Sequence, residues 1–582
     1  MKKTKIIATI GPASDTEEML EKMFLAGVNV ARLNFSHGDH QSHKKIIDRV
    51  KTVREKLFLP IAIMLDTKGP EIRTMTIQGG SIELKEGDNF SLLSEEVEGD
   101  QNQCSVTYKD LWKDIDLGQK ILIDDGLLEL EVTEIQEGKI TTKALNDGSV
   151  ASKKGINVPG AEIKLPALTD KDIEDILFGI REEVDFVAAS FIRKPEDILA
   201  IRQVLETNGG KDIKIIAKIE NKEGVDNMDA IIDLADGIMV ARGDLGVEIE
   251  PERIPLVQKK MIARSVQEGI PVITATQMLD SMMRNPRPTR AEVTDVANAI
   301  FDRTSAIMLS GETASGKYPL EAVQMMTRIA ISTEGSLDYA KILEDSAHDF
   351  DITTTNVIAR NTCEMARELS AKAIVIATAT GYSSRAVAKF RPETMIVAVT
   401  PNEKALRQMS LHWGTKGILA PGPTKDVVID TVQTAKEAGA ILEGDLVIII
   451  AGIPQGKTGS TNLIKVHQVS KVAAKGAGIG KGVVVGKATV VTDNYDFTRD
   501  FNNGDIIIAR SYTPELASFL ERSGGFITEE EGLTSAAAIA GISLGVPTIV
   551  GVKDALEILE HGKFMTMDAA TGEIYVGHVD AK

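Results

Sequence analysis

Two acidic residues, Glu220 and Asp244, stand at the ends of two successive hydrophobic runs, KIIAKIE and DGIMVARGD. If these runs are neighbouring parallel strands, both carboxylates face the same mouth. That arrangement suits a hard divalent cation that completes its octahedron with water and substrate oxygens. Mg2+ is the favoured occupant, with Mn2+ as a substitute. For either carboxylate alone an ordinary ion pair is an equally good interpretation, whereas the two together favour a metal.

Lys218 precedes Glu220 by two residues, so both side chains lie on the same face of one strand. Beside a metal, the ammonium group would act as a point charge toward a phosphoryl or enolate oxygen. The alternative is a counter-ion with no part in the chemistry.

A second set of polar residues lies in the sequence RLNFS and at the end of the run PIAIMLD. Arg32, Asn34 and Ser36 alternate along one strand and so share a face. The guanidinium group of Arg32 suits a phosphate. The oxygens of Asn34 and Ser36, with those of Asp66 and Thr67, could hold a large monovalent cation. The residues alone favour a simple hydrogen-bond cluster.

Eight runs rich in Val, Ile and Ala, separated by helical stretches, must position these groups. Eight such strands predict a (β/α)8 TIM barrel, whose active site lies at the carboxyl ends of the strands. The runs cover 5–11, 28–36, 60–66, 185–191, 214–220, 236–244, 271–278 and 305–312. Further polar candidates at these ends are Arg242, Gly243, Thr276, Gln277, Ser310 and Glu312.

Three other domains are predicted around this barrel, which then comprises residues 1–69 and 165–344. Residues 70–164 have strand-and-turn patterns without helical periodicity, which predicts an inserted β-barrel lid. Alternating helices and strands predict an open α/β domain over 345–472. A Gly-rich, β-leaning stretch predicts a fourth domain over 473–582.

Bulk composition limits the possible partners. The chain has 582 residues, too many for one core, and 66 basic against 85 acidic residues give a net charge of -19. Nucleic acid and anionic membranes are therefore disfavoured as partners. No signal or membrane-spanning segment is expected, which predicts a cytoplasmic protein. Cys104 and Cys363 lack metal-binding spacing and are expected to be reduced structural thiols.

The chain also carries long motifs, which read in order LNFSHG, LDTKGPEIR, SKKGINVPG, SFIRKPED, AKIEN, VARGDLGVEI, ATQMLDSM, NPRPTRAEVTDVANA and MLSGETASGKYP. Over about residues 1 to 470 this text resembles the pyruvate kinase family. The resemblance implies a barrel A domain, a B domain that closes as a lid, a C domain with effector sites, and a homotetramer. It implies the last step of glycolysis, in which the phosphoryl group of phosphoenolpyruvate moves to ADP and gives pyruvate and ATP.

The resemblance also assigns roles to individual positions. Arg32 would bind the phosphoryl group, Lys218 would stabilise the transition state, and Glu220 and Asp244 would hold Mg2+. In the family, a Glu at the position of Glu71 accompanies dependence on K+, whereas a Lys there replaces the ion. The K+ ligands implied by the resemblance are Asn34, Ser36, Asp66 and Thr67.

The remaining substrate contacts follow from the same resemblance. The substrate carboxylate would lie against Gly243, Asp244 and Thr276, and ADP would contact Arg73 and Lys154. Protonation of the enolpyruvate methylene carbon is expected through a water or hydroxyl relay near Thr276, because an unaided Thr is a poor acid at neutral pH.

The text TATGYSSR, residues 378–385, resembles the phosphate-binding loop of the family's sugar-phosphate effector site, and GKTGST, residues 456–461, could face it. Turn hydroxyls and N–H groups suit phosphate, although an ordinary loop at a helix start is the alternative. The family usually has Gly and Asp where this chain has Arg303 and Ser305, which puts packing or subunit contacts in doubt. The effector candidates are Thr378, Thr380, Gly381, Ser383 and Ser384.

Residues 474–582 resemble the mobile phosphohistidine domain of phosphoenolpyruvate-utilising enzymes. That family's motif TSHAA reads TSAAA over residues 534–538, so Ala536 replaces the histidine. Without an imidazole there is no phosphoryl carrier, and a structural or interface role is expected. His561 and His578, outside the motif, are expected at the surface.

Three alternative functions fit parts of this pattern. A lyase or aldolase of the same barrel group also holds a pyruvate enolate on Mg2+, but it needs no nucleotide lid with Arg73 and Lys154. A phosphoenolpyruvate dikinase-like enzyme requires the histidine that Ala536 replaces. A non-catalytic, sugar-phosphate-sensing scaffold would not need every catalytic position filled.

Overall fold

The computed structural model describes residues 2–346, 350–422, 426–452, 459, 461–469, 472–492 and 501–577. The chain divides into two compact units. The first comprises Met1–Pro423 and Ile448–Lys465, and the second comprises Thr424–Val447 and Val466–Lys582. Within the described ranges, no helix combines the length and the apolar character needed to cross a membrane.

Eight parallel strands of the first unit close into a barrel in the order β1-β17-β16-β15-β14-β13-β3-β2. Ile7, Met64, Met239 and Met308 belong to a buried cluster that fills the barrel interior. The predicted TIM barrel is therefore confirmed. The strands are β1 (Lys5–Thr9), β2 (Val30–Asn34), β3 (Ala62–Asp66), β13 (Phe186–Ala189), β14 (Lys214–Ile219), β15 (Gly237–Ala241), β16 (Val272–Ala275) and β17 (Ala306–Leu309).

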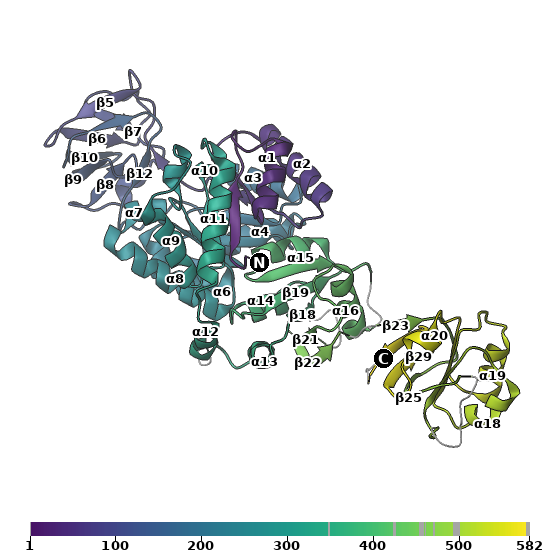
Figure 1. The fold of residues 1–582 in the computed structure, drawn as a ribbon. Helices are drawn as coiled ribbons and strands as arrows, with labels where there is room; N and C mark the ends of the chain where they lie inside the picture. Colours follow the sequence, from purple (N-terminus) through teal and green to yellow (C-terminus); the bar gives the residue numbers. More distant parts are fainter. Residues whose placement is uncertain are drawn as a thin grey trace. The chain divides into compact units, whose positions relative to one another are not determined.

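Helices surround this barrel and bury their apolar faces against the outer side of its strands (Figure 1). Thr169 and Thr289 begin two of them with capping boxes, in which the hydroxyl accepts a hydrogen bond from the backbone of the third helical residue. The helices are α1 (Glu17–Ala26), α2 (His40–Leu57), α3 (Asp170–Arg181), α4 (Pro195–Thr207), α5 (Lys222–Asp226), α6 (Met228–Leu234), α7 (Arg242–Glu248), α8 (Ile254–Glu268), α9 (Arg290–Phe301), α10 (Gly311–Ala314) and α11 (Pro319–Glu334).

Several runs extend beyond the strands that they contain, and the run over 236–244 shows this most clearly. The run over 236–244 was expected to be strand to its end, but β15 stops at Ala241 and α7 begins at Arg242. Asp244 therefore lies in the first turn of a helix, where a carboxylate interacts favourably with the helix dipole.

The segment between β3 and α3 forms a seven-stranded sheet in the order β4-β12-β8-β9-β10-β6-β7 and a two-stranded sheet, β11-β5. A bridge between Thr74 and Val106 brings the two edges of the larger sheet together. The strands are β4 (Ile72–Arg73), β5 (Ser81–Leu84), β6 (Asn89–Leu93), β7 (Gln103–Ser105), β8 (Lys120–Ile123), β9 (Leu128–Gln136), β10 (Lys139–Ala144), β11 (Gly148–Ala151) and β12 (Gly155–Asn157).

A five-stranded sheet follows the barrel, in the order β20-β19-β18-β21-β22. Three of its strands were predicted, whereas β20 and β22 were missed because half-exposed residues interrupt their apolar pattern. The elements are α12 (Tyr339–Asp345), α13 (Thr354–Glu368), β18 (Ala373–Ala377), α14 (Tyr382–Ala388), β19 (Met395–Thr400), α15 (Glu403–Gln408), β20 (Thr415–Leu419), β21 (Leu446–Gly452) and β22 (Thr461–Gln468).

The second unit contains α16 (Val427–Glu437) and an eight-stranded sheet, β23-β30-β29-β25-β26-β27-β28-β24. Ala536 is the first residue of α19, and the hydroxyl of Ser535 accepts a hydrogen bond from the N–H of Ala538. The other elements are β23 (Val472–Lys475), β24 (Ala477–Ile479), β25 (Val483–Val490), β26 (Ile506–Ala509), α18 (Ala517–Leu520), β27 (Gly525–Thr528), α19 (Ala536–Leu544), β28 (Thr548–Val550), α20 (Ala555–Ile558), β29 (Phe564–Asp568) and β30 (Glu573–Val576).

Candidate active site

Lys218 lies at the centre of a buried ionic cluster at the carboxyl ends of the barrel strands. Its Nζ is 2.8 Å from Glu220 Oε1, 3.1 Å from Asp66 Oδ1 and 2.8 Å from the hydroxyl of Ser190. Burial alone would lower the pKa of Lys218, but the charges of Asp66 and Glu220 outweigh it and raise that pKa. The side chain is therefore a fixed positive charge.

Asp66 joins Lys218 to a second cation. Its Oδ2 accepts a 2.6 Å hydrogen bond from Arg32 Nε, and Arg32 Nη1 donates to the hydroxyl of Thr9 at 2.8 Å. Burial favours protonation of Asp66, but Arg32 and Lys218 together hold the pKa of this carboxyl below its usual value. The carboxylate thus fixes the directions of both cations.

Glu220 follows β14 directly and is 2% exposed. Its Oε2 accepts a 2.6 Å hydrogen bond from the N–H of Phe191. Burial raises the pKa of Glu220 to about 7, opposed by Lys218 and reinforced by the charge of Asp244. Desolvation by the surrounding atoms also raises the pKa of Asp244, although this residue is exposed at the mouth. The two carboxylates therefore lie close enough to repel each other, and a cation between them would relieve this.

The donor set of this pair fits a hard cation that keeps most of its ligands from water and substrate. Among the described residues, no group of three or more His, Cys, Asp and Glu side chains could enclose a metal ion. Two carboxylates at an open mouth suit Mg2+, which is usually bound through one or two carboxylates plus water and phosphate oxygens. A thiolate or imidazole cage of the zinc type does not fit these residues.

Thr276 and Gly243 lie against each other beside this pair. The hydroxyl of Thr276 accepts a 2.7 Å hydrogen bond from the N–H of Gly243 and donates to Ala275 O at 2.7 Å. Thr276 has a φ of +66°, a left-handed conformation that is unfavourable for a β-branched residue. Arg242 holds this strained turn, because its Nη2 donates to Thr276 O at 2.7 Å.

Arg242 itself points to a structural partner, since its Nη1 lies 2.7 Å from Asp295. Glu312 is likewise structural, because its carboxylate accepts hydrogen bonds from the N–H groups of Leu279 and Ser310. Gln277 is exposed at the surface.

The residues predicted for a monovalent cation lie at the ends of β2 and β3, where Asn34 and Asp66 are register partners. The amide oxygen of Asn34 accepts a hydrogen bond from the N–H of Ser36 at 3.1 Å. Thr67 Oγ1 accepts from the N–H of Ser190 at 3.1 Å. Ser36 is exposed and lies in the turn after β2, so the strand alternation used to place it ends at Asn34.

The nucleotide candidates lie on the inserted segment. Both carboxylate oxygens of Glu71 accept hydrogen bonds from the guanidinium group of Arg73, at 2.7 and 2.8 Å. Arg73 also donates to Lys153 O at 2.6 Å, and Lys154 Nζ lies 2.9 Å from Asp124. Both cations thus have local partners that a bound polyphosphate would displace or share.

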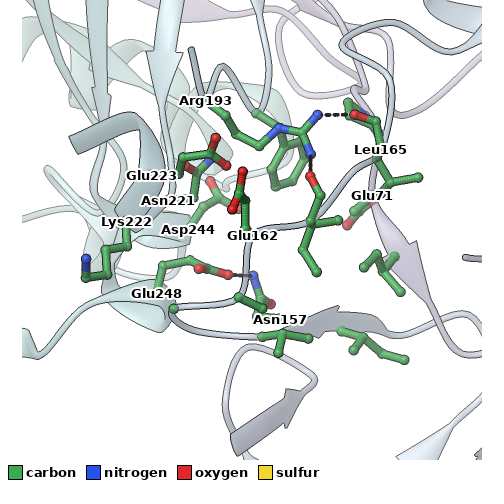
Figure 2. Close-up of a pocket in the computed structure, with 18 of the residues that line it drawn as sticks. Glu71, Asn157, Glu162, Leu165, Arg193, Asn221, Lys222, Glu223, Asp244 and Glu248 are labelled. Carbon is green, nitrogen blue, oxygen red and sulfur yellow. Dashed lines mark hydrogen bonds between the residues drawn. The ribbon is translucent and has the colours of Figure 1, made fainter. Parts of the chain in front are cut away.

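A pocket of about 410 Å3 separates this inserted segment from the barrel (Figure 2). Asp244 lines it, and Asn157 Nδ2 donates across it to Glu248 Oε1 at 2.8 Å. Arg193 donates hydrogen bonds to the carbonyl oxygens of Ile163 and Leu165, which lie in the segment between the last strand of the inserted sheet and α3. Figure 2 shows Glu162, Glu223 and Asp244 gathered on one side of the pocket.

The effector candidates lie before and within α14. Gly381 has a φ of +79°, and its N–H donates to the hydroxyl of Thr378 at 3.0 Å. Ser384 Oγ contacts Gly381 O and His412 Nδ1 at 2.8 and 2.9 Å. Thr380 is exposed. These contacts order the loop from within.

One described contact reaches the text GKTGST. Ser383 Oγ lies 2.7 Å from Thr461 Oγ1, at the end of the GKTGST text. Residues 456–458 and 460 of that text lie outside the described residues, as does His578. His561 is exposed, as expected, and its Nδ1 accepts a hydrogen bond from the N–H of Val490 at 3.2 Å. Both Cys104 and Cys363 are buried free thiols.

Three groups in the cluster were missed from the sequence: the hydroxyls of Thr9 and Ser190 and the N–H of Phe191. Each lies at the carboxyl end of a barrel strand. The rule that polar residues at these ends deserve a functional interpretation would have found Thr9 and Ser190.

Comparison with known proteins gives matches along the whole chain. Residues 1–323 match the family described as pyruvate kinase, barrel domain, and residues 356–467 match pyruvate kinase, alpha/beta domain. Residues 501–572 match PEP-utilising enzyme, mobile domain.

Individual relatives agree with these matches. Pyruvate kinase of Staphylococcus haemolyticus is 48% identical over 584 residues, which cover 100% of both chains. Pyruvate kinase of Sporosarcina psychrophila is 48% identical over 582 residues and 99% of each chain. A crystal structure of a pyruvate kinase from Cryptosporidium parvum has a TM-score of 0.77 and 39% identity, and covers 80% of this chain and 96% of that one.

The reaction follows from these relatives, since identity near one half extends over the full length and includes the C-terminal domain. The enzyme is a phosphotransferase that acts on phosphoenolpyruvate and ADP and forms pyruvate and ATP, and its family uses metal ions. The chain belongs to the pyruvate kinase family.

Proposed function

We propose that this pyruvate kinase works with Mg2+ held by Glu220 and Asp244 and with K+ held by Asn34, Ser36, Asp66 and Thr67. The observation that supports this most directly is the position of Lys218, whose ammonium group joins Asp66 of the second set to Glu220 of the first. The two sets therefore border a single space. A phosphoryl group in that space would meet all of them.

Arg32 and Lys218 are the residues we assign to the phosphoryl group. Both are buried, and Asp66 fixes the directions of both. Fixed cations at a developing charge need no reorganisation during the reaction, which makes them effective in transition-state stabilisation. Bound Mg2+ would supply further positive charge at the transferring group and at the substrate oxygens.

Gly243, Asp244 and Thr276 form the place we assign to the substrate carboxylate. The Thr276 hydroxyl already donates to Ala275 O, so its proton is engaged by the backbone. This supports a relay through water or another hydroxyl for protonation of the methylene carbon, with Thr276 as an orienting group.

Arg73 and Lys154 are the residues we assign to the nucleotide, on an inserted domain that closes as a lid over residues 70–164. Both are partly exposed on the segment that borders the pocket beside Asp244. Anionic phosphates would replace Glu71 and Asp124 as partners of these two cations. The other domains are the barrel, 1–69 and 165–344, the C domain, 345–472, and the appended domain, 473–582.

Regulation and assembly are assigned from family membership. We place a phosphorylated effector at the loop formed by Thr378, Thr380, Gly381, Ser383 and Ser384, and we expect a homotetramer in the cytoplasm. The appended domain has a structural or interface role. Glu530 Oε1 accepts a 3.0 Å hydrogen bond from the backbone N–H of Ala536, the residue that stands where the family has its phosphate-carrying histidine.

A lactate dehydrogenase-coupled assay tests the proposal. Pyruvate formation should require phosphoenolpyruvate, ADP and Mg2+, and should collapse when Na+ or a tetraalkylammonium ion replaces K+. Full activity in the absence of K+ would remove the cation site from the proposal. Incubation with 32P-labelled phosphoenolpyruvate should leave no acid-labile phosphate on the protein, and stable labelling would contradict the role given to the appended domain.

A further inference from the structure

A second pocket, of about 300 Å3, lies between the barrel and the following α/β domain, where no substrate group has been assigned. It is bounded by α6 and α8 of the barrel, by the C-terminal end of α12, and by the residues that follow α14 (Figure 1). Its volume is at the lower end of the range for small-molecule sites.

The lining is strongly cationic, although the whole chain carries a net charge of -19. Its titratable residues are Asp229, Lys260, Arg264, Arg303 and Lys389. Three of the cations, Lys260, Arg303 and Lys389, form no ion pair with any residue that the structure describes. Arg264 differs, because Asp229 and Asp233 each lie 3.2 Å from its guanidinium group and Glu268 also binds it.

Lys389 is the most unusual of the three because it is only 7% exposed. Its Nζ donates to Gln267 O at 3.2 Å and lies over the rings of Phe350 and Phe390, at 5.3 and 5.4 Å. Ring faces and one carbonyl group are weak compensation for a desolvated ammonium ion. Burial lowers the pKa of Lys389 to about 8, which means that the free protein holds this charge at a cost.

A fourth cation, Arg391, does not line the pocket but contacts the backbone of Arg303, which does. Arg391 is 4% exposed, and its donors reach Ala388 O, Arg303 O and the hydroxyl of Ser305 but no carboxylate. Its Nε has no hydrogen-bond partner. Burial and the charge of Arg303 lower the pKa of Arg391 to about 9. Unpaired buried cations are destabilising. An anion that neutralises the cations at this pocket would therefore be bound favourably.

We propose that this pocket binds a small phosphate monoester, with the phosphate held by Lys260, Arg303 and Lys389 and the organic part against the half-buried ring of Phe350. Asp229 also lines the pocket but pairs with Arg264, so the three cations that have no ion pair among the described residues suit a dianion better than a singly charged group. A compact sugar or nucleoside monophosphate has the right size for the space. This site is separate from the loop over 378–385, where Thr378 and Ser384 use their hydroxyls within the loop.

The test uses the full-length protein without substrates, in a buffer free of phosphate and sulfate at fixed ionic strength. Inorganic phosphate, ribose 5-phosphate and adenosine 5′-monophosphate are titrated by calorimetry, and thermal melting is followed in parallel. At least one monoester should bind saturably and raise the melting temperature, because a ligand of the folded state stabilises it by mass action. Inorganic phosphate measures the phosphate contribution alone.

Variants locate the binding site. Arg303→Gln and Lys260→Glu should each weaken binding at least about tenfold, which corresponds to about 1.4 kcal/mol. Lys389→Met should weaken binding to the same extent, because it removes the charge but keeps an unbranched apolar side chain of similar length. Lys259→Gln is the matched control, because Lys259 neighbours Lys260 on α8 but pairs with Asp302. The affinity of this variant for the monoester should equal that of the wild type.

Thr380→Glu separates this pocket from the loop over 378–385, because it places a negative charge on an exposed loop residue. Binding that survives Thr380→Glu and fails in Arg303→Gln supports the proposal. Binding that fails only in Thr380→Glu, or no binding of any monoester to the unaltered protein, overturns it. If Lys389→Met does not fold, the surface changes at Lys260 and Arg303 still decide the question.

Discussion

Lys218 Nζ lies 2.8 Å from Glu220 Oε1, and both side chains are almost completely buried. The surrounding cluster has three carboxylates, Asp66, Glu220 and Asp244, against two cations, Arg32 and Lys218. With all three carboxylates ionised, the site has an excess of negative charge before any substrate arrives. A divalent cation reverses that sign, and an anionic phosphoryl group can then enter.

Lys218→Met should reduce kcat by about 10²–10³-fold, because it removes a fixed cation at the transferring group. The change should affect the Michaelis constant for ADP little, since the nucleotide candidates lie on the inserted segment. The coupled pyruvate assay measures both parameters.

Lys218→Arg is the control that keeps the positive charge at this position but changes its geometry. The Arg guanidinium is planar and larger than an ammonium group, so it should restore part of the rate at most. If Lys218→Met keeps more than about one tenth of the wild-type kcat, the role assigned to this ammonium group is wrong, since the expected effect is several kcal/mol.

Asp66→Asn should weaken activation by K+, because it removes a charged oxygen from the cation set and leaves two buried cations without their shared partner. We expect the K+ concentration for half-maximal rate to rise at least about tenfold, in line with the loss of a hydrogen bond to a charged group. The measurement is the rate as a function of K+ at saturating Mg2+. An unchanged K+ response, with the protein still folded, would place the ion elsewhere.

Much of the barrel could be predicted because strands that are buried on both faces consist of short runs of apolar residues. Each of the eight predicted runs contains a strand of the structure. Strand alternation also placed Lys218 and Glu220 together correctly. It failed for Ser36, because β2 ends at Asn34 and the alternation no longer holds in the turn. The sequence placed Asp244 at the same end of the barrel as Glu220, as in the structure. It did so by treating Asp244 as a strand residue, whereas Asp244 lies in α7.

Contacts between distant segments were beyond this kind of reasoning. Arg391 donates to Arg303 O from 88 residues further along the chain, and no periodicity in either segment indicates the pairing. The same holds for Asn157 and Glu248, which are 91 residues apart. Such contacts depend on how domains pack, whereas apolar patterns describe each element by itself.

Lys389→Met should stabilise the ligand-free protein at pH 7 and lose this effect at high pH. Burial lowers the pKa of Lys389 from 10.5 to about 8, against the opposing charges of Glu268 and Asp351. Between these two values the unfolded chain binds a proton that the folded chain does not, so stability rises with pH there. Below pH 8 the charged side chain destabilises the fold by about 1–3 kcal/mol.

Melting temperatures of the two proteins at a series of pH values measure this effect. The difference should be largest near pH 7 and should shrink as pH rises through about 8 toward 10.5. A variant that is less stable than the wild type at pH 7 would show that Lys389 already has an anionic partner in the free protein.

Asn157→Ala should loosen the inserted domain, because Asn157 Nδ2 donates to Glu248 Oε1 across the pocket between that domain and the barrel. Glu248 is the last residue of α7, and Asp244 lies in the first turn of the same helix. The contact thus joins the lid directly to the element that carries a metal ligand. Loss of one hydrogen bond to a charged group costs about 1.5–3 kcal/mol, and part of that should appear as a Michaelis constant for ADP several-fold higher.

A double-mutant cycle with Glu248→Ala isolates the contact. If the two side chains act on the lid through each other, the double variant should be no worse than either single variant, with a coupling energy of about 0.5–1.5 kcal/mol. Glu248→Gln keeps an acceptor for Asn157 and should behave like the wild type, even though burial raises the pKa of Glu248. Effects of the two alanine changes that simply add would mean that lid closure does not depend on this hydrogen bond.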